Sequence, residues 1–519
     1  MRVTRLAAAA VGVFALVAAV SASALPSAPS GAGPSAAAGP PAQVIVRPGV
    51  IHVGRADAGP PSTADCEKAY QIACYGPAQL RRAYDLPALY ARGVTGQGTT
   101  IVIVDSYGSP TIRHDLGVFD KAYGLPAPPA FRIIQPAGRV PRYDPGNSDM
   151  VGWAGETTLD VEWAHTVAPG AKLLLVETPV SETEGVHGFP QIVAAEEYVL
   201  RHYRADVISQ SFSATEETFA TRAQVQALRG AYQLAGQDHV TVLTASGDSG
   251  ATDLRLDETT YYRFRVTSWP DSDPLVTGVG GTQLHFTAHG TPVAPTVWND
   301  TYNRHANEFA GGGPGPSPLA SGGGTSIFFT RPQYQNGVRA VVGGSRGVPD
   351  ISMSAACDGS VNTYGSFGGA PVGWSPTCGT SEATPLFAGI VALADQVAGH
   401  PLGLINPALY QLAARHAPGI VEVTSGDNTV SFTQDGHQQT VTGFTAGPGY
   451  NLATGVGTVN ARYFVPELAR LAGRSLFLLT ERSVVLVLAH RDTLRIFAII
   501  WCETPCSGYN RYGSSLIPY

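Results

Sequence analysis

Two carboxylates spaced four residues apart are the first feature of the sequence that could do chemistry. Glu156 and Asp160 lie in the segment Gly155-Glu-Thr-Thr-Leu-Asp-Val-Glu-Trp163. If the segment is helical, this spacing places both side chains on one face. Such a like-charged pair is slightly unfavourable on an exposed helix, whereas two adjacent carboxyls can share a proton and separate their pKa values. For the pair alone, an ordinary acidic helix surface stays the alternative.

A serine at the start of a predicted helix is the second feature. Ser381 belongs to Gly379-Thr-Ser-Glu-Ala-Thr-Pro385, which opens an apolar helical segment ending near Gly399. The free N–H groups and the dipole of a helix N-terminus stabilise a developing oxyanion, which suits a nucleophilic serine. Pro385 is expected in the first turn, where its missing N–H costs least. By itself the pattern is more typical of a Ser N-cap.

A nucleophilic serine needs a base, and a His–Asp pair is the usual one. Asp105 ends an apolar run, and His289 begins a His-Gly-Thr tripeptide that resembles the signature of subtilisins. That histidine has to lie on a helix, however, and Pro292 and Pro295 interrupt any helix here. The preceding residues alternate like a strand that leads into a turn. We therefore expect His289 to be an exposed loop residue and the carboxylate pair to be the better base.

Three motifs in chain order resemble the sedolisin family of serine-carboxyl peptidases. They are Glu156-x-x-x-Asp160, Ser246-Gly-Asp248-x-Gly250 and Gly379-Thr-Ser381-x-x-x-Pro385, and the resemblance covers residues 77–468. It implies that Ser381 attacks the peptide carbonyl, that Glu156 takes its proton, and that Asp160 shares the proton of Glu156. It also implies that a protonated Asp248 donates to the oxyanion. Alone, Asp248 would be interpreted as a turn residue between two glycines.

The resemblance predicts a secreted, acid-active serine-carboxyl endopeptidase that is monomeric and acts on protein or peptide substrates. Activity in acid follows because Asp248 must be protonated to donate, and the pKa of an ordinary Asp is ~3.9. Two alternatives stay open. One is an inactive sedolisin-like binding or surface module. The other is a conventional subtilisin that uses Asp105, His289 and Ser381.

The elements that must position these residues alternate between strands and helices. Apolar runs at 99–105, 171–178, 205–212 and 240–246 predict buried strands, and helical periods cover 191–203, 222–237, 381–399 and 406–416. Alternation of this kind predicts an α/β fold with a parallel sheet covered on both faces, with ligands at the carboxyl ends of the strands. The resemblance makes this the subtilisin-like three-layer fold, with a mainly parallel central sheet.

Composition divides the chain into four parts. Residues 1–24 have the basic start, apolar run and small-x-small site of a signal peptide. Residues 25–65, rich in Ala, Pro, Gly and Ser, predict a linker or short pro-segment. The peptidase domain is expected at 66–470, and 471–519 is an extension of unassigned role. The net charge of −7 argues against a nucleic-acid partner, and no apolar run reaches the ~20 residues that span a bilayer.

The cysteines and one loop suggest further features. Proximity in the sequence favours the pairs Cys66–Cys74 and Cys357–Cys378, with free buried thiols as the alternative. The resemblance also implies a calcium loop formed by two Asp carboxylates and backbone carbonyls. The matching ligand set here is Glu422, Val423, Gly447, Gly449 and Asn451. Glu stands at the first carboxylate position and Asn at the second, so Ca²⁺ is expected to bind at a weakened site.

Overall fold

The structure is a computed structural model that describes residues 59–313, 315–472, 483–490 and 493–501. A mainly parallel sheet of eight strands forms its centre, in the order β10-β9-β7-β5-β2-β4-β3, with β13 also paired to β9. Only the β9–β10 pair in this sheet is antiparallel. The strands are β2 (Thr100–Ser106), β3 (Phe131–Ile134), β4 (Lys172–Thr178), β5 (Val207–Gln210), β7 (Thr241–Ala245), β9 (Thr277–Phe286), β10 (Pro292–Val297) and β13 (Ile351–Ser354).

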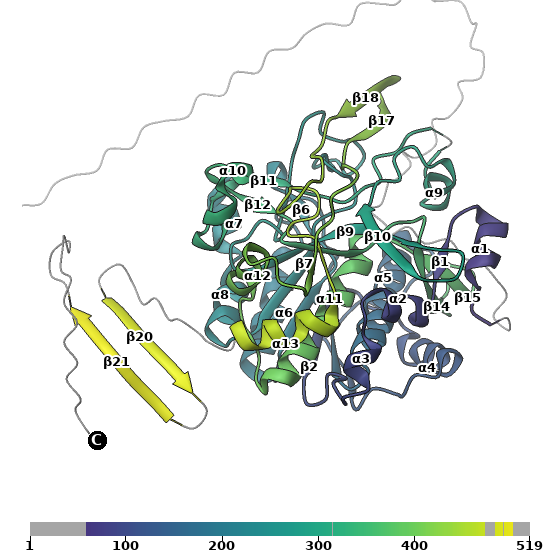
Figure 1. Cartoon of the computed structure of the whole chain (residues 1–519). Coiled ribbons are helices and arrows are strands. Elements are labelled where there is room, and N and C mark those ends of the chain that lie inside the picture. The colour runs from purple at the N-terminus through teal and green to yellow at the C-terminus, as the bar shows by residue number, and fades with distance from the viewer. Residues whose placement is uncertain (1–58, 314, 473–482, 491–492, 502–519) are drawn as a thin grey trace, which may run out of the picture. The chain divides into compact units, whose positions relative to one another are not determined.

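Both faces of this sheet are covered, which explains the apolar runs of its central strands. In β2, Ile101 and Ile103 pack into the core on the side of α5 and α11, while Val102 and Val104 pack on the side of α6 and α8. All four side chains are buried. A strand that is buried on both faces has no polar alternation. The three-layer α/β architecture predicted above is confirmed (Figure 1).

Helices of very different lengths make up the outer layers. They are α1 (Thr63–Tyr70), α2 (Pro77–Ala83), α3 (Pro87–Tyr90), α4 (Ile112–Tyr123), α5 (Ser148–Val167), α6 (Phe189–His202), α7 (Arg222–Ala227), α8 (Gly230–Gln237), α9 (Arg304–Phe309), α10 (Arg339–Val342), α11 (Thr380–Ala398), α12 (Asn406–Ala414) and α13 (Ala461–Ala472), with short 3₁₀ turns η1 (Glu216–Thr218) and η2 (Gln333–Val338). None of the described helices is long and apolar enough to cross a membrane.

Short strands form several small sheets. They are β1 (Cys74–Tyr75) with β14 (Ser360–Gly365) and β15 (Gly373–Thr377); β6 (Ala214–Thr215) with β8 (Ser268–Trp269); β11 (Gly324–Thr330) with β12 (Ser345–Val348); β16 (Ile420–Val421) with β19 (Thr458–Val459); β17 (Val430–Gln434) with β18 (His437–Val441); and β20 (Ser483–His490) with β21 (Thr493–Trp501). The last pair belongs to the C-terminal extension, to which the sequence assigns no role.

The predicted elements agree with the structure within two residues at each end, with one exception. The helix expected over 222–237 is two helices, α7 and α8, because the chain turns at Leu228 and Arg229. The Arg229 guanidinium forms two hydrogen bonds, of 2.6 and 2.9 Å, with the buried carboxylate of Asp273. This pairing and the low helix propensity of Gly230 together favour the break.

Three of the predicted segments lie mainly or wholly outside the described residues. None of the signal peptide at 1–24 is described, only 59–65 of the linker at 25–65, and less than half of the extension at 471–519. Within 59–65, α1 begins at Thr63 with a capping box, in which Ser62 accepts from the Asp65 N–H and the Asp65 carboxylate accepts from the Ser62 N–H. The helix α1 therefore includes residues that lie before the predicted domain boundary at 66.

Candidate active site

Glu156 and Asp160 lie in the buried half of α5. The Asn147 side chain caps this helix by accepting from the N–H groups of Asp149 and Met150. From Ala154 to the end of the helix every residue is buried, and Glu156 and Asp160 are 3% and 0% exposed. An acidic helix surface, the bland alternative for this pair, is therefore excluded.

Ser381 is the second residue of α11, as the sequence predicts, but Pro385 lies further along than expected. It is the sixth residue of α11 and not part of the first turn. In a regular helix its N–H would donate to the Ser381 carbonyl, and proline has no N–H. The hydroxyl of Ser211, which directly follows β5, instead lies 3.4 Å from this carbonyl oxygen. The same hydroxyl donates to Asp160 Oδ1 at 2.9 Å, so Ser211 links the two helices.

Three buried carboxyls meet beside Ser381, and their pKa values are raised. Burial is the main cause for Glu156 and Asp160, followed by charge repulsion among the carboxyls; hydrogen bonding with Ser381 and Ser211 partly lowers the pKa of Glu156. The third member is Asp105 at the end of β2, whose pKa burial raises to about 7. The carboxyls of Asp105 and Asp160 shift each other's pKa, and two carboxyls that interact in this way can share one proton.

Asp248 lies in the loop after β7 and caps the start of α11. Its Oδ1 atom accepts from the Thr380 N–H and from the Thr380 hydroxyl, both at 2.7 Å. Its Oδ2 atom faces Gly379, where an added Cβ would come within 2.6 Å of this oxygen. Burial raises the pKa of Asp248 to about 6, against these two hydrogen bonds. The carboxyl is therefore protonated in moderate acid, with Oδ2 as the oxygen that can carry the proton.

The structure brings all four predicted residues together. Hydrogen bonding with Ser381 lowers the pKa of Glu156, and the charges of Asp105 and Asp248 raise it. His289, in contrast, is an exposed residue of the turn between β9 and β10, as predicted. The arrangement of a conventional subtilisin, with this histidine as the base, does not fit the structure.

Sequence reasoning missed two residues of this site. Asp105 was weighed only as the acid of a histidine-based triad, and Ser211 was not singled out. Both lie at the carboxyl ends of strands predicted to be buried, β2 and β5, which are neighbours in the sheet. Ligands of parallel sheets bind at this edge. A polar residue at the carboxyl end of each predicted strand is the signal that could have found them.

Both predicted disulfides are present, and one of them precedes the nucleophile loop. Cys357 pairs with Cys378, the residue before Gly379, and Cys66 pairs with Cys74. All four cysteines are buried. The Cys357–Cys378 bridge joins the segment after β13 to the residue that follows β15. It therefore restrains the chain where it enters α11.

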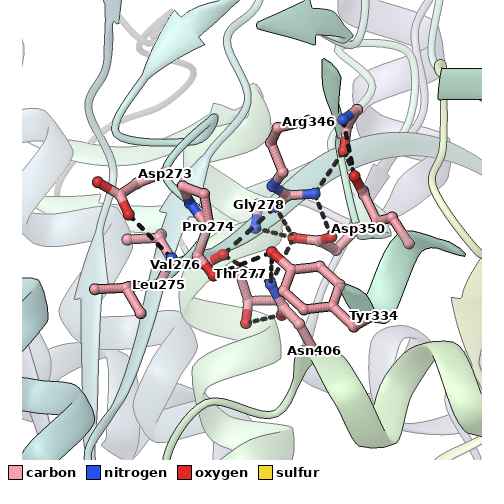
Figure 2. A network of polar contacts seen from close by, with 12 residues as sticks. Asp273, Pro274, Leu275, Val276, Thr277, Gly278, Tyr334, Arg346, Asp350 and Asn406 are labelled. Carbon is pink, nitrogen blue, oxygen red and sulfur yellow. Dashed lines mark hydrogen bonds and ion pairs between the residues drawn. The ribbon is translucent and has the colours of Figure 1, made fainter. Parts of the chain in front are cut away.

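A second buried polar cluster surrounds Arg346 and Asp350, and Figure 2 shows its contacts. The Arg346 guanidinium pairs with both oxygens of Asp350, which directly precedes β13, and both side chains are fully buried. Asp350 also accepts from the Gly278 N–H at 2.9 Å and from the Tyr410 hydroxyl at 2.8 Å. These contacts involve the amino ends of β9 and β13. The cluster therefore anchors strands and takes no part in the site at their carboxyl ends.

Two of the predicted calcium ligands already use their side chains in other contacts. The only carboxylate of the set, Glu422, lies 3.3 Å from the exposed His416. Asn451 uses its side-chain oxygen within its own turn. The residues present therefore do not fit the ion that the resemblance implies.

Comparison with known proteins finds a family model and several peptidases that are similar to this chain. A family model described as "Subtilase family" matches residues 148–434. Kumamolisin from Bacillus sp. (strain MN-32) is 31% identical over 402 residues, which are 74% of this chain and 62% of that protein. Sedolisin from Pseudomonas sp. (strain 101) is 28% identical over 395 residues, 74% and 60% of the two chains. Human tripeptidyl-peptidase 1 is 30% identical over 327 residues, 60% and 51%.

A solved structure agrees with the fold. Pseudomonas sedolisin, a serine-carboxyl proteinase complexed with two molecules of pseudo-iodotyrostatin, superposes with a TM-score of 0.60 at 24% identity, over 77% of this chain and 99% of that one. Similarity at this level supports the fold. The chain spans less than two thirds of the length of each of the three relatives above.

Proposed function

The chain belongs to the subtilase family and to its sedolisin branch, and on that premise we propose that it is a secreted serine-carboxyl endopeptidase that works in acid. The observation that carries the proposal is the interaction of Ser381 with a buried carboxyl, Glu156. Two further buried carboxyls, Asp160 and Asp105, interact with Glu156 in turn. A buried carboxyl of raised pKa can accept a proton from a hydroxyl and return it, as a histidine does in other serine peptidases.

The first chemical step forms an acyl-enzyme. The Ser381 hydroxyl oxygen attacks the peptide carbonyl carbon while its proton passes to Glu156. The tetrahedral oxyanion is stabilised by the Ser381 N–H and by a proton on Asp248 Oδ2. Its collapse breaks the C–N bond, and Glu156 gives the proton to the leaving amine. Water then attacks the acyl-enzyme by the same route, with Glu156 as the base, and releases the second product.

Asp160 and Asp105 support the base without touching the substrate. At acidic pH one negative charge is shared among Glu156, Asp160 and Asp105, because hydrogen bonds from protonated neighbours favour the charged member. Ser211 donates to Asp160 at 2.9 Å and keeps this carboxyl in place. The base is therefore available while Asp248 is still protonated.

Secretion is proposed from the N-terminal sequence and the cysteines. Arg2 and Arg5 precede an apolar run and a small-x-small site, as in a signal peptide. The two disulfides agree with an oxidising compartment.

The test is hydrolysis of a denatured protein across the pH range, with the products identified by mass spectrometry. We expect wild type to cleave internal bonds fastest in acid, and Ser381→Ala to show no turnover while keeping the wild-type circular dichroism spectrum. His289→Ala is the matched control and should keep full activity. Activity in Ser381→Ala would refute the nucleophile. Release of tripeptides alone would replace endopeptidase with exopeptidase action, and an inactive wild type would favour the binding-module alternative.

A further inference from the structure

Asn451 bridges the two segments of the loop that resembles the family's calcium site. Its side-chain N–H group donates to the Val423 carbonyl oxygen at 3.5 Å. That carbonyl is among the oxygens that the resemblance assigns to the ion. Both residues are buried, with exposed fractions of 1% for Val423 and 7% for Asn451. A neutral donor therefore points at an oxygen that a cation would otherwise bind.

The surrounding hydrogen bonds fix the orientation of the Asn451 amide. Its Oδ1 atom accepts from the N–H groups of Ala453 and Thr454, at 3.1 and 2.9 Å, and from the Thr454 hydroxyl at 3.1 Å. Turning the amide over would aim its NH₂ group at two N–H donors and its oxygen at the Val423 carbonyl. Both contacts would be repulsive. The donor must therefore face Val423.

The charge that calcium needs is also missing from the loop. Ca²⁺ takes about six to eight oxygen ligands, several of them carboxylates, and its affinity falls as ligand charge is removed. Gly447 and Asn451 line a cavity of about 340 Å³ whose walls contain no carboxylate. Glu422 does not line this cavity, and its carboxylate faces His416 at 3.3 Å. The loop thus offers a cation one carboxylate, which is already engaged.

The Asn451 turn also connects the loop to the central sheet. Asn451 and Gly455 exchange two backbone hydrogen bonds, of 3.0 and 2.9 Å. The next residue, Val456, donates to the carbonyl oxygen of Asp350, which precedes β13. An added Cβ at Gly455 would come within 2.2 Å of the Asp350 carbonyl carbon. The Asn451 turn therefore connects the Val423 carbonyl to the strand β13 of the central sheet.

We infer that Asn451 has taken the place of the family's calcium ion, so that an amide bridge holds this loop together and the chain is stable without the metal. The inference rests on membership of the sedolisin branch and on the contacts of Asn451. It is independent of the proposed catalysis, since its readout is thermal stability.

The first experiment compares the full chain in a calcium chelator and in millimolar calcium chloride, with melting temperature and calorimetric calcium binding as readouts. Ser381→Ala protein prevents self-digestion. We expect the same melting temperature in both solutions and no heat of binding. A melting temperature that falls in chelator and recovers saturably with calcium would overturn the inference.

The second experiment restores the carboxylates with the double variant Glu422→Asp/Asn451→Asp. The Asn451→Asp change removes the amide donor and places a carboxylate oxygen beside the Val423 carbonyl oxygen, which is repulsive. In chelator we expect the melting temperature of the double variant to fall by roughly 2–10 °C, and calcium to recover most of the fall. Recovery is the sign that the amide occupies the ion's position.

Asn428→Asp is the matched control. Asn428 is another buried bridging amide, which donates to the Ser321 carbonyl at 3.0 Å and accepts from the Phe444 N–H at 2.7 Å. This variant should lose stability in both solutions alike. If calcium rescues the control as well as the double variant, or rescues neither, the assignment of Asn451 to the ion's position is wrong.

Discussion

The proposed mechanism needs two carboxyls near Ser381 to be in opposite protonation states at the same pH. Glu156 has to be charged to accept the proton of Ser381, and Asp248 has to be neutral to donate to the oxyanion. Burial raises both pKa values, so the difference in protonation has to come from the carboxyls beside Glu156. Glu156 has Asp160 nearby and beyond it Asp105, with which it can share a charge. Asp248 instead accepts two hydrogen bonds from Thr380, and burial nevertheless raises its pKa to about 6. A bell-shaped pH profile follows, with Asp248 setting its alkaline limb.

Substitution of Asp248 tests this limb. Asp248→Ala removes the donor and should lower kcat about 10²–10³-fold at the acidic optimum, with little change in KM. Asp248→Asn keeps a donor that does not titrate, so its alkaline limb should move above the wild-type position near the pKa of about 6. The measurement is the initial rate of hydrolysis as a function of pH for wild type and the two variants. An unchanged alkaline limb in Asp248→Asn would show that another group sets it.

At the scale of the elements, α11 and the segment before it determine where Ser381 lies. The helix α11 could be predicted from sequence because its helical pattern is long and local, whereas α5 was only assumed from the spacing of Glu156 and Asp160. The expected start of α11 at residue 381 differs from the observed one by a single residue, so the wrong placement of Pro385 in the first turn does not come from the helix start. The α7–α8 break was likewise missed, since it depends on the contact between Arg229 and Asp273. Local pattern predicts the element, and long-range contacts decide its ends.

The Cys357–Cys378 disulfide should matter for both stability and turnover. Replacing both cysteines with Ala frees a loop of sequence separation 21 and should lower the free energy of unfolding by roughly 3 kcal/mol. Because Cys378 precedes Gly379, kcat should fall too. The control replaces Cys66 and Cys74, whose bridge joins α1 to β1 with a separation of 8. That variant should lose stability and keep kcat, as measured by denaturant melts and initial rates; equal kcat values in both variants would contradict the expected role.

At the scale of the whole molecule, many of the buried carboxyls among the described residues form no ion pair with Lys or Arg. Part of the candidate site could be predicted from sequence, because Glu156, Asp160, Asp248 and Ser381 belong to motifs in a characteristic chain order. The meeting of Asp105 with Asp160 could not, because it depends on the order of strands in the sheet. Burial raises pKa values both in the site and elsewhere, and those of the following residues reach about 6 to 8: Asp105, Asp120, Glu196, Glu217, Asp248 and Asp300.

These raised pKa values predict that the fold is most stable in acid. A carboxyl with a higher pKa in the folded than in the unfolded chain binds more protons when folded, so its stabilising effect is complete in acid and is lost as pH rises through the folded value. His165 opposes this trend as pH falls from its unfolded value of ~6.5 to its folded value, because burial lowers its pKa to about 4. The melting temperature of Ser381→Ala protein should therefore be highest near pH 5 and lower by roughly 5–10 °C near pH 8. A melting temperature that is constant or rises between these values would mean that the buried carboxyls are already ionised in the folded protein. Glu196→Gln, which removes one such group at a distance from Ser381, should reduce the pH dependence without changing the pH of maximal turnover in the otherwise wild-type chain.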